Sequence, residues 1–154
     1  MMDTYKERIY WHIRRLVVSH EDAEDILQET FINAYRFAGS FNGESRIYTW
    51  LYRIATNECI GLFRKNKNNR MEELTDKVVG RLTGNDLENS EEIQVRFQEA
   101  ILKLPEKQRI VFNLRYYDDL SYEEISLIMN TSVSALKTNY HYAQEKIKQN
   151  MLNY

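Results

Sequence analysis

Apolar residues recur every three or four positions along most of the chain, which is the spacing of one face of an α-helix. In a first block, residues 3–66, this pattern predicts an opening helix, a second helix that starts near Ser19, and a third from about Arg46 to Lys65. The inward stripe of the second helix consists of Ala23, Ile26, Leu27, Phe31 and Ala34. The block is therefore predicted to form a small helical domain.

A second block, residues 91–154, shows the same periodicity. Its first helix has a predicted buried stripe made of Ile93, Phe97, Ala100, Ile101 and Leu104. Pro105 ends that helix because its ring does not fit a helix interior. The next helix is predicted over 106–117. Ser121 and Glu124 then have the spacing of a capping box, so a further helix starts directly after Ser121.

Residues 67–90, between the two blocks, are rich in Asn and Glu, poor in aromatic residues and interrupted by Gly80 and Gly84. This composition predicts a flexible acidic linker. The expected fold class is all-α. A three-helix N-terminal domain over 1–66 and a four-helix C-terminal domain over 91–154 are joined by the linker.

Composition sets further bounds on the protein. The 154 residues include 29% charged side chains and one cysteine, Cys59. No apolar run approaches the roughly 18 residues that span a membrane, and the start of the chain has no apolar signal-peptide core. One cysteine cannot form an internal disulfide, and Cys59 is predicted to be a small core residue. These features indicate a soluble cytoplasmic protein.

Charge is segregated along the chain, although the net charge is only −2. Residues 21–29 hold five acids and no base, residues 46–70 hold six bases and one acid, and residues 71–99 hold eight acids and three bases. Such segregation indicates separate contacts with partners of opposite charge.

The stretch LSYEEISLIMNTSVSALKTNYHYAQEKI predicts two helices joined by a tight turn. Asn130 is one of the few non-glycine residues that tolerate the positive φ of such a turn, and Thr131 or Ser132 can cap the second helix. The polar face of that helix carries Ser134, Lys137, Thr138, His141 and Tyr142. These side chains can contact base edges or phosphates in a major groove. The alternative is an ordinary helical hairpin with a solvated polar face.

The third predicted helix places Arg46, Trp50, Arg53, Asn57 and Arg64 on one outer face. An exposed aromatic ring can stack on unpaired bases, guanidinium groups neutralise phosphates, and a side-chain amide reads a base edge. This face therefore fits single-stranded DNA. The alternative is that Trp50 packs against the first helix and the arginines only keep the surface polar.

Together these features resemble an extracytoplasmic-function (ECF) sigma factor of the sigma-70 family, the minimal promoter-recognition subunit of bacterial RNA polymerase. The stretch DAEDILQETF resembles the family's segment for binding core polymerase, and FNGESRIYTWLYRIATN resembles the loop and helix that open and read the −10 promoter element. The stretch LPEKQRIVFNLRYYDDLSYEEISLIMNTSVSALKTNYHYA resembles the domain that reads the −35 element. Three motifs in the family's order are more specific than a single helix-turn-helix.

The resemblance and the helical spacing assign three sets of residues. The acidic face, expected to bind the β′ clamp helices of the polymerase, consists of Asp22, Glu24, Asp25, Gln28 and Glu29. The −10 face, which includes a loop for a flipped base, consists of Phe41, Gly43, Ser45, Arg46, Trp50, Arg53, Asn57 and Arg64. The −35 face consists of Ser134, Ala135, Lys137, Thr138, Asn139, His141 and Tyr142.

The resemblance also implies partners: core RNA polymerase through its β′ and β subunits, promoter DNA at both elements, and an anti-sigma factor that holds the chain at the inner membrane. It implies a protein with no enzymatic activity, cofactor, metal or small-molecule substrate. The chain departs from the family at Asn139 and Tyr142, where arginine is usual, and at Asn130, where glycine often stands. Fewer positive charges release fewer counterions, so we expect weak −35 binding by the isolated chain.

Other interpretations are open from the residues themselves. Acids in the first turn of a helix complement its macrodipole by about 0.3–1 kcal/mol each, but this effect does not extend to Glu29. The chain could instead be a self-sufficient helix-turn-helix regulator that binds duplex DNA without polymerase. A carboxylate-metal phosphodiesterase is a further alternative, although His12, His20 and His141 lack the spacing of metal ligands.

Overall fold

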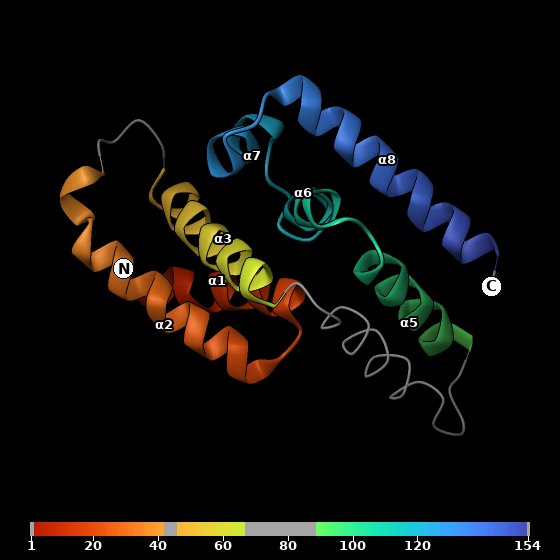
Figure 1. The fold of residues 1–154 in the computed structure, drawn as a ribbon, viewed down its shortest axis with the longest axis horizontal. Coiled ribbons are helices and arrows are strands. Elements are labelled where there is room, and N and C mark those ends of the chain that lie inside the picture. Colours follow the sequence, from red (N-terminus) through yellow and green to blue (C-terminus); the bar gives the residue numbers. More distant parts are fainter. Residues whose placement is uncertain (1, 42–45, 67–88, 154) are drawn as a thin grey trace.

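The N-terminal half consists of α1 (Met2–Val17), α2 (His20–Arg36) and α3 (Ile47–Lys65), with a short 3₁₀ turn, η1 (Ala38–Ser40), after α2 (Figure 1). The computed structural model describes residues 2–41, 46–66 and 89–153. The predicted start of α2 is confirmed, because the hydroxyl of Ser19 accepts a hydrogen bond from the backbone N–H of Asp22 at 3.4 Å.

The C-terminal half consists of α5 (Asn89–Leu102), α6 (Glu106–Tyr116), α7 (Tyr122–Met129) and α8 (Val133–Leu152). All regular elements within the described ranges are helical, as the periodicity predicts. The capping box of Ser121 and Glu124 is present at the start of α7. The predicted linker lies outside the described residues, except for its last two positions, which open α5.

A helix-turn-helix joins α7 to α8. Asn130 has φ 51° and ψ 49°, the left-handed conformation that was predicted for it. Ser132, rather than Thr131, caps α8, and its hydroxyl accepts the N–H of Ala135 at 3.2 Å. The hydroxyl of Thr131 instead donates to the carbonyl oxygen of Met129. The conformation of the turn is therefore set by three consecutive residues, Asn130, Thr131 and Ser132.

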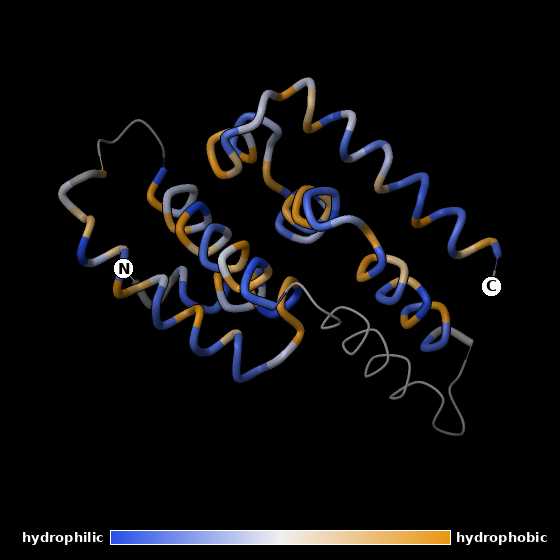
Figure 2. The backbone as a smooth tube through the Cα atoms, viewed as in Figure 1, coloured by the Kyte–Doolittle hydropathy of each residue, from blue (hydrophilic) through white to orange (hydrophobic). Residues whose placement is uncertain are grey.

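The apolar positions run as stripes along each helix (Figure 2). Cys59 is fully buried, as predicted, and burial raises the pKa of its thiol to about 12. One prediction of the buried stripe is wrong: Ile93 is 55% exposed. The apolar cluster between α5 and α8 includes Phe97 and Met151 but not Ile93, because the stripe continues beyond the point where α8 covers α5.

The two halves pack against each other in what we call the closed arrangement. α3 lies against α7, and α1 lies against α6. One buried cluster crosses the boundary, since it includes Leu16 and Leu51 of the N-terminal half together with Leu114 and Ile125 of the C-terminal half. A second cluster, around Phe112, belongs to the C-terminal half alone. Sequence periodicity predicted the separate faces but not their contact.

Candidate functional site

The acidic face lies along the exposed side of α2. Its members Glu24, Asp25, Gln28 and Glu29 are exposed, and Asp22 is half-buried at the capped start of the helix. A groove of about 740 Å³ runs beside these carboxylates. Its apolar lining includes Ile32 and Tyr35, which are 43% and 83% exposed. Negative charge beside exposed apolar side chains is suited to a partner helix with one basic and one apolar face.

The −10 face lies on α3 and on the residue that follows η1. Arg46, Arg53, Asn57 and Arg64 are exposed, as predicted from their spacing. Gly43 and Ser45 lie outside the described residues. The four exposed side chains give this helix three guanidinium groups and one amide at the surface, and the guanidinium carbon of Arg46 lies 6.0 Å from the ring centroid of Tyr48.

Trp50 differs from the prediction of an exposed ring. It is half-buried and packs against the cluster that crosses both halves. Its ring centroid lies 5.4 Å from that of Phe41, so the two aromatic residues form one surface at the start of α3. Trp50 therefore packs partly into the fold and is not the fully exposed ring that was expected, and its role on the −10 face stays a prediction.

The −35 face lies on α8. Ser134, Lys137, Thr138, His141 and Tyr142 are exposed, whereas Ala135 and Asn139 are half-buried. The ammonium group of Lys137 lies 5.7 Å from the ring centroid of Tyr122. The guanidinium group of Arg115 lies 4.8 Å from the centroid of the same ring. Tyr122 therefore gathers two positive charges beside the start of α8.

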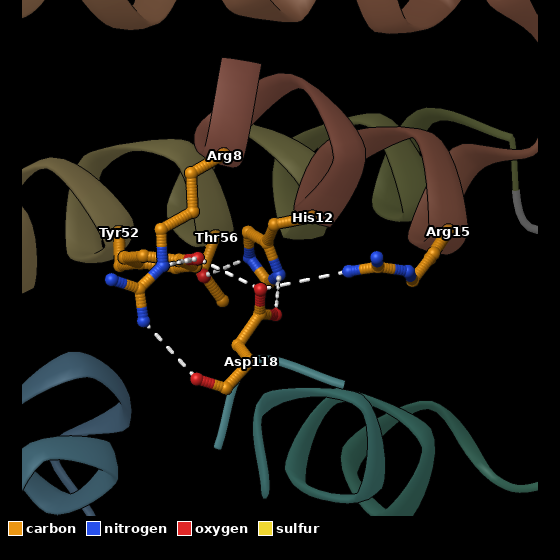
Figure 3. Close-up of polar contacts among 6 residues, drawn as sticks. All are labelled: Arg8, His12, Arg15, Tyr52, Thr56 and Asp118. Carbon is orange, nitrogen blue, oxygen red and sulfur yellow. Dashed lines mark hydrogen bonds and ion pairs between the residues drawn. The ribbon is translucent and has the colours of Figure 1, made fainter. Parts of the chain in front are cut away.

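A polar cluster that joins the two halves was not predicted from the sequence. We call it the interdomain cluster, and it consists of Arg8, His12 and Arg15 of α1, Tyr52 and Thr56 of α3, and Asp118 of the loop between α6 and α7 (Figure 3). Tyr52 donates a hydrogen bond of 2.8 Å to Oδ1 of Asp118. Arg15 lies 3.5 Å from the same oxygen, and His12 Nδ1 lies 3.6 Å from Oδ2.

The remaining contacts orient the cluster. Arg8 donates to the hydroxyl of Tyr52 at 3.0 Å and to the backbone carbonyl oxygen of Asp118 at 3.1 Å. His12 Nε2 is 2.9 Å from the hydroxyl of Thr56. Burial, followed by the charge of Asp118 and its hydrogen bond, raises the pKa of Tyr52. The hydroxyl therefore stays protonated and remains a donor to the carboxylate.

Arg109 is a second buried polar group at the boundary. Its Nη1 donates to the carbonyl oxygen of Leu16 at 2.6 Å, and its guanidinium carbon lies 4.8 Å from the ring centroid of Phe63. Burial lowers the pKa of Arg109 to about 10, so the group stays charged at neutral pH. A sequence signal for it existed, since Arg109 and Asn113 interrupt the apolar run of α6 on one face.

Tyr48 and Glu124 form a further contact across the boundary. Tyr48, in the first turn of α3, donates a hydrogen bond to Oε2 of Glu124, while Oε1 accepts the backbone N–H of Ser121 at 3.1 Å. Partial burial acts to raise the pKa of Glu124. The hydrogen bonds from Tyr48 and Ser121, with the charge of Arg46, outweigh that effect and hold the pKa below its ordinary value.

Two further features would bear on the function of the described residues, a membrane-spanning helix and a metal-binding cluster. No helix there is long and apolar enough to cross a membrane. No group of three or more His, Cys, Asp or Glu side chains in those ranges is placed to hold a metal ion.

Comparison with known families and proteins gives consistent matches over both halves. The family model for sigma-70 region 2 matches residues 1–69, and the model for sigma-70 region 4 matches residues 94–147. The ECF RNA polymerase sigma factor SigW of Bacillus subtilis is 38% identical over 162 residues, covering 98% of this chain and 87% of that protein. The RNA polymerase sigma-H factor of Pseudomonas aeruginosa is 34% identical, covering 93% of this chain and 80% of that protein.

Two solved structures have the same fold. The sigma factor RpoE of Bartonella quintana, in complex with the anti-sigma factor NepR, aligns with a TM-score of 0.73 at 20% identity, over 97% of this chain and 93% of that one. The protein CnrH, in complex with the cytosolic domain of CnrY, aligns with a TM-score of 0.70 at 18% identity, over 96% of this chain and 82% of that one. At these identities the likeness concerns the fold.

Proposed function

The chain belongs to the ECF sigma factors of the sigma-70 family, and from this premise we propose what each of its three faces does. As a member of that family it binds core RNA polymerase and directs promoter-specific initiation of transcription, and it is not itself an enzyme. The residues that carry these contacts in this chain are our proposal.

The acidic face binds the polymerase. Asp25 lines the groove that includes Ile32 and Tyr35 together with Lys6, and Glu29 lies one turn further along the exposed side of α2. This combination suits the β′ clamp helices if they present a basic and partly apolar face. Interaction with the helix macrodipole explains the acids Glu21 and Asp22 at the start of α2, but this interaction does not extend to Glu29.

The −10 face binds the opened strand. Arg53 and Arg64 neutralise phosphates, Asn57 reads a base edge, and the joined rings of Phe41 and Trp50 offer a surface for an unpaired base. The −35 face binds duplex DNA, with α8 in the major groove. Lys137, held near Tyr122, contacts the backbone beside the groove.

The observation that carries the proposal is that the −10 and −35 faces are exposed on two helices from separate halves, each within a matched sigma-70 region. A single regulator domain needs only the second of these faces. By its place in transcription the chain is expected to act in the cytoplasm. The sigma factor RpoE of Bartonella quintana, solved with the anti-sigma factor NepR, supports the expectation of such a partner here as well.

The experiment is run-off transcription with purified core polymerase on a pool of random promoter sequences. We expect transcripts only when the chain and the core enzyme are both present, and the enriched templates should share two short elements. Tight, specific binding of the chain alone to duplex DNA, without stimulation of transcription, would instead favour a self-sufficient regulator.

A further inference from the structure

The closed arrangement is incompatible with simultaneous use of both DNA-binding faces, an inference that rests on the proposed function. α3 packs on α7, and α7 packs on α8, so the −10 and −35 helices are two helix spacings apart. Two spacings amount to roughly 20 Å. Promoter elements two DNA turns apart are separated by roughly 70 Å. The halves must therefore part before both elements can be contacted.

We propose that the interdomain cluster is a latch that keeps the free chain closed, with Asp118 as its central residue. The Asp118 side chain is only 5% exposed. Although it belongs to the C-terminal half, the polar partners of its carboxylate in the described part of the chain come from the N-terminal half: Tyr52, His12 and Arg15. These contacts exist only while the halves touch, so their free energy favours the closed arrangement alone.

A second contact blocks the −10 face directly. The hydrogen bond from Tyr48 places the Glu124 carboxylate at the first turn of α3, where it acts electrostatically on Arg46. Arg46 is exposed and belongs to the −10 face. A carboxylate held there repels DNA phosphate and partly neutralises the positive charge that the phosphate would meet. The closed arrangement thus opposes DNA binding locally as well as by distance.

The same boundary contains groups that favour opening. Arg109 Nε and Nη2, and both side-chain amide atoms of Asn113, are buried without a hydrogen-bond partner among the described residues. Such groups lose hydration without compensation, and exposure to water restores it. The same boundary also buries apolar side chains, Leu16 and Leu51 with Leu114 and Ile125, so separation of the halves exposes apolar surface as well. The boundary therefore contains both the interdomain cluster, which favours the closed arrangement, and buried polar groups that lack partners within the described ranges, which lower the free-energy cost of separating the halves.

The test compares Asp118→Asn with Asp119→Asn. Asparagine keeps the size of Asp118 and can still accept from Tyr52, but it cannot pair with Arg15 or a protonated His12. Asp119 is the matched control because it is adjacent and exposed, and its φ of 52° is one that asparagine tolerates. Circular dichroism establishes that each variant is folded. Tyr52→Phe, which removes the hydroxyl and keeps the ring, serves as a second latch variant.

Two quantities are measured on the full-length chains. Small-angle X-ray scattering gives the radius of gyration, which for a compact chain of 154 residues is about 15 Å. We expect that value for wild type and Asp119→Asn, and a larger one for the latch variants. The second quantity is the affinity for a DNA probe that carries a duplex −35 element and an unpaired −10 strand, because the closed arrangement opposes contact with both elements whereas the acidic face on α2 is exposed in it. It should become about threefold to tenfold tighter in the latch variants, because more of the free chain is competent to bind.

Each result decides the proposal. A wild-type chain that is already extended would overturn the latch, as would folded Asp118→Asn and Tyr52→Phe variants that remain as compact as wild type and bind the DNA probe no better. Expansion and tighter binding in both latch variants, but not in Asp119→Asn, would establish it. Failure of every chain, wild type included, to bind the DNA probe would overturn the proposed DNA-binding faces, and the scattering comparison alone would then decide for or against the latch.

Discussion

The hydroxyl of Tyr52, in the helix that carries the −10 face, donates a 2.8 Å hydrogen bond to Asp118, 66 positions further along the chain. Arg8 donates to the same hydroxyl at 3.0 Å, so one side-chain oxygen connects α1, α3 and the loop before α7. Substitution of Tyr52 by Phe removes this hydroxyl and leaves the shape of the ring unchanged, so the contribution of its hydrogen bonds can be measured.

Tyr52→Phe is expected to lower the free energy of unfolding by about 1–3 kcal/mol, because a buried carboxylate oxygen loses its shortest hydrogen bond. The measurement is urea denaturation followed by circular dichroism. Tyr35→Phe is the control, since Tyr35 is 83% exposed and should change stability by less than about 0.5 kcal/mol. Equal stability of the two variants would contradict the assigned hydrogen bond.

Glu124 predicts a specific pH dependence. Its pKa is held below the ordinary value of 4.5, so its stabilising contribution is complete above that value and is lost as the pH falls through the lower, folded-state pKa. We expect the free energy of unfolding of wild type to fall more steeply than that of Glu124→Gln between about pH 5 and about pH 3. Glutamine retains the acceptor for the Ser121 N–H. Parallel pH profiles would show that the carboxylate does not contribute.

The acidic face is tested by charge reversal. The double variant Asp25→Lys, Glu29→Lys should weaken binding to core polymerase by about tenfold or more, since like charges facing each other at an interface cost several kcal/mol. Both side chains are exposed, so helicity should not change. Glu145→Lys, on the exposed side of α8, is the control for charge reversal elsewhere. Unchanged affinity of the double variant in pull-down assays would remove this role.

Substitutions of Asn57 and Arg53 should distinguish the contribution of base contacts from that of phosphate contacts on the −10 face. Asn57→Ala is expected to reduce discrimination at one base by about 1–3 kcal/mol. Arg53→Ala should weaken binding to all sequences equally and lower the salt dependence by about 0.7 of a counterion, the value for single strands. Affinity of the holoenzyme for melted −10 templates, measured over a salt series, distinguishes the two. Identical behaviour of the variants would contradict this division.

Local features of the fold were predictable because their causes lie within a few residues. Ser19 starts α2, and Ser121 with Glu124 starts α7, through contacts to residues three positions away. Asn130 makes the left-handed turn through its own backbone conformation. Helical spacing also identified Arg53 as an exposed member of the −10 face. Spacing could not show how far a neighbouring helix extends, and for that reason it failed at Ile93 and was incomplete at Trp50.

The contacts between the halves could not be derived from the sequence. Arg8 meets Asp118 across 110 positions, and Arg109 meets Leu16 across 93. A polar residue in an apolar run signals a buried partner, but periodicity does not say which one. Sequence spacing bears on His12 only as a possible metal ligand, whereas the structure places it fully buried beside Asp118. Long-range polar pairing therefore had to come from the structure.

The two carboxylate oxygens of Glu124 contact different parts of the protein. Oε1 holds the first turn of α7 through Ser121, and Oε2 reaches across to Tyr48. Because each oxygen has its own partner, separation from the N-terminal half breaks the contact with Tyr48 but leaves the capping box at the start of α7 intact. The C-terminal half can thus separate from the N-terminal half with the first turn of α7 already formed. That turn then needs no further ordering of its backbone when this half reaches the upstream promoter element.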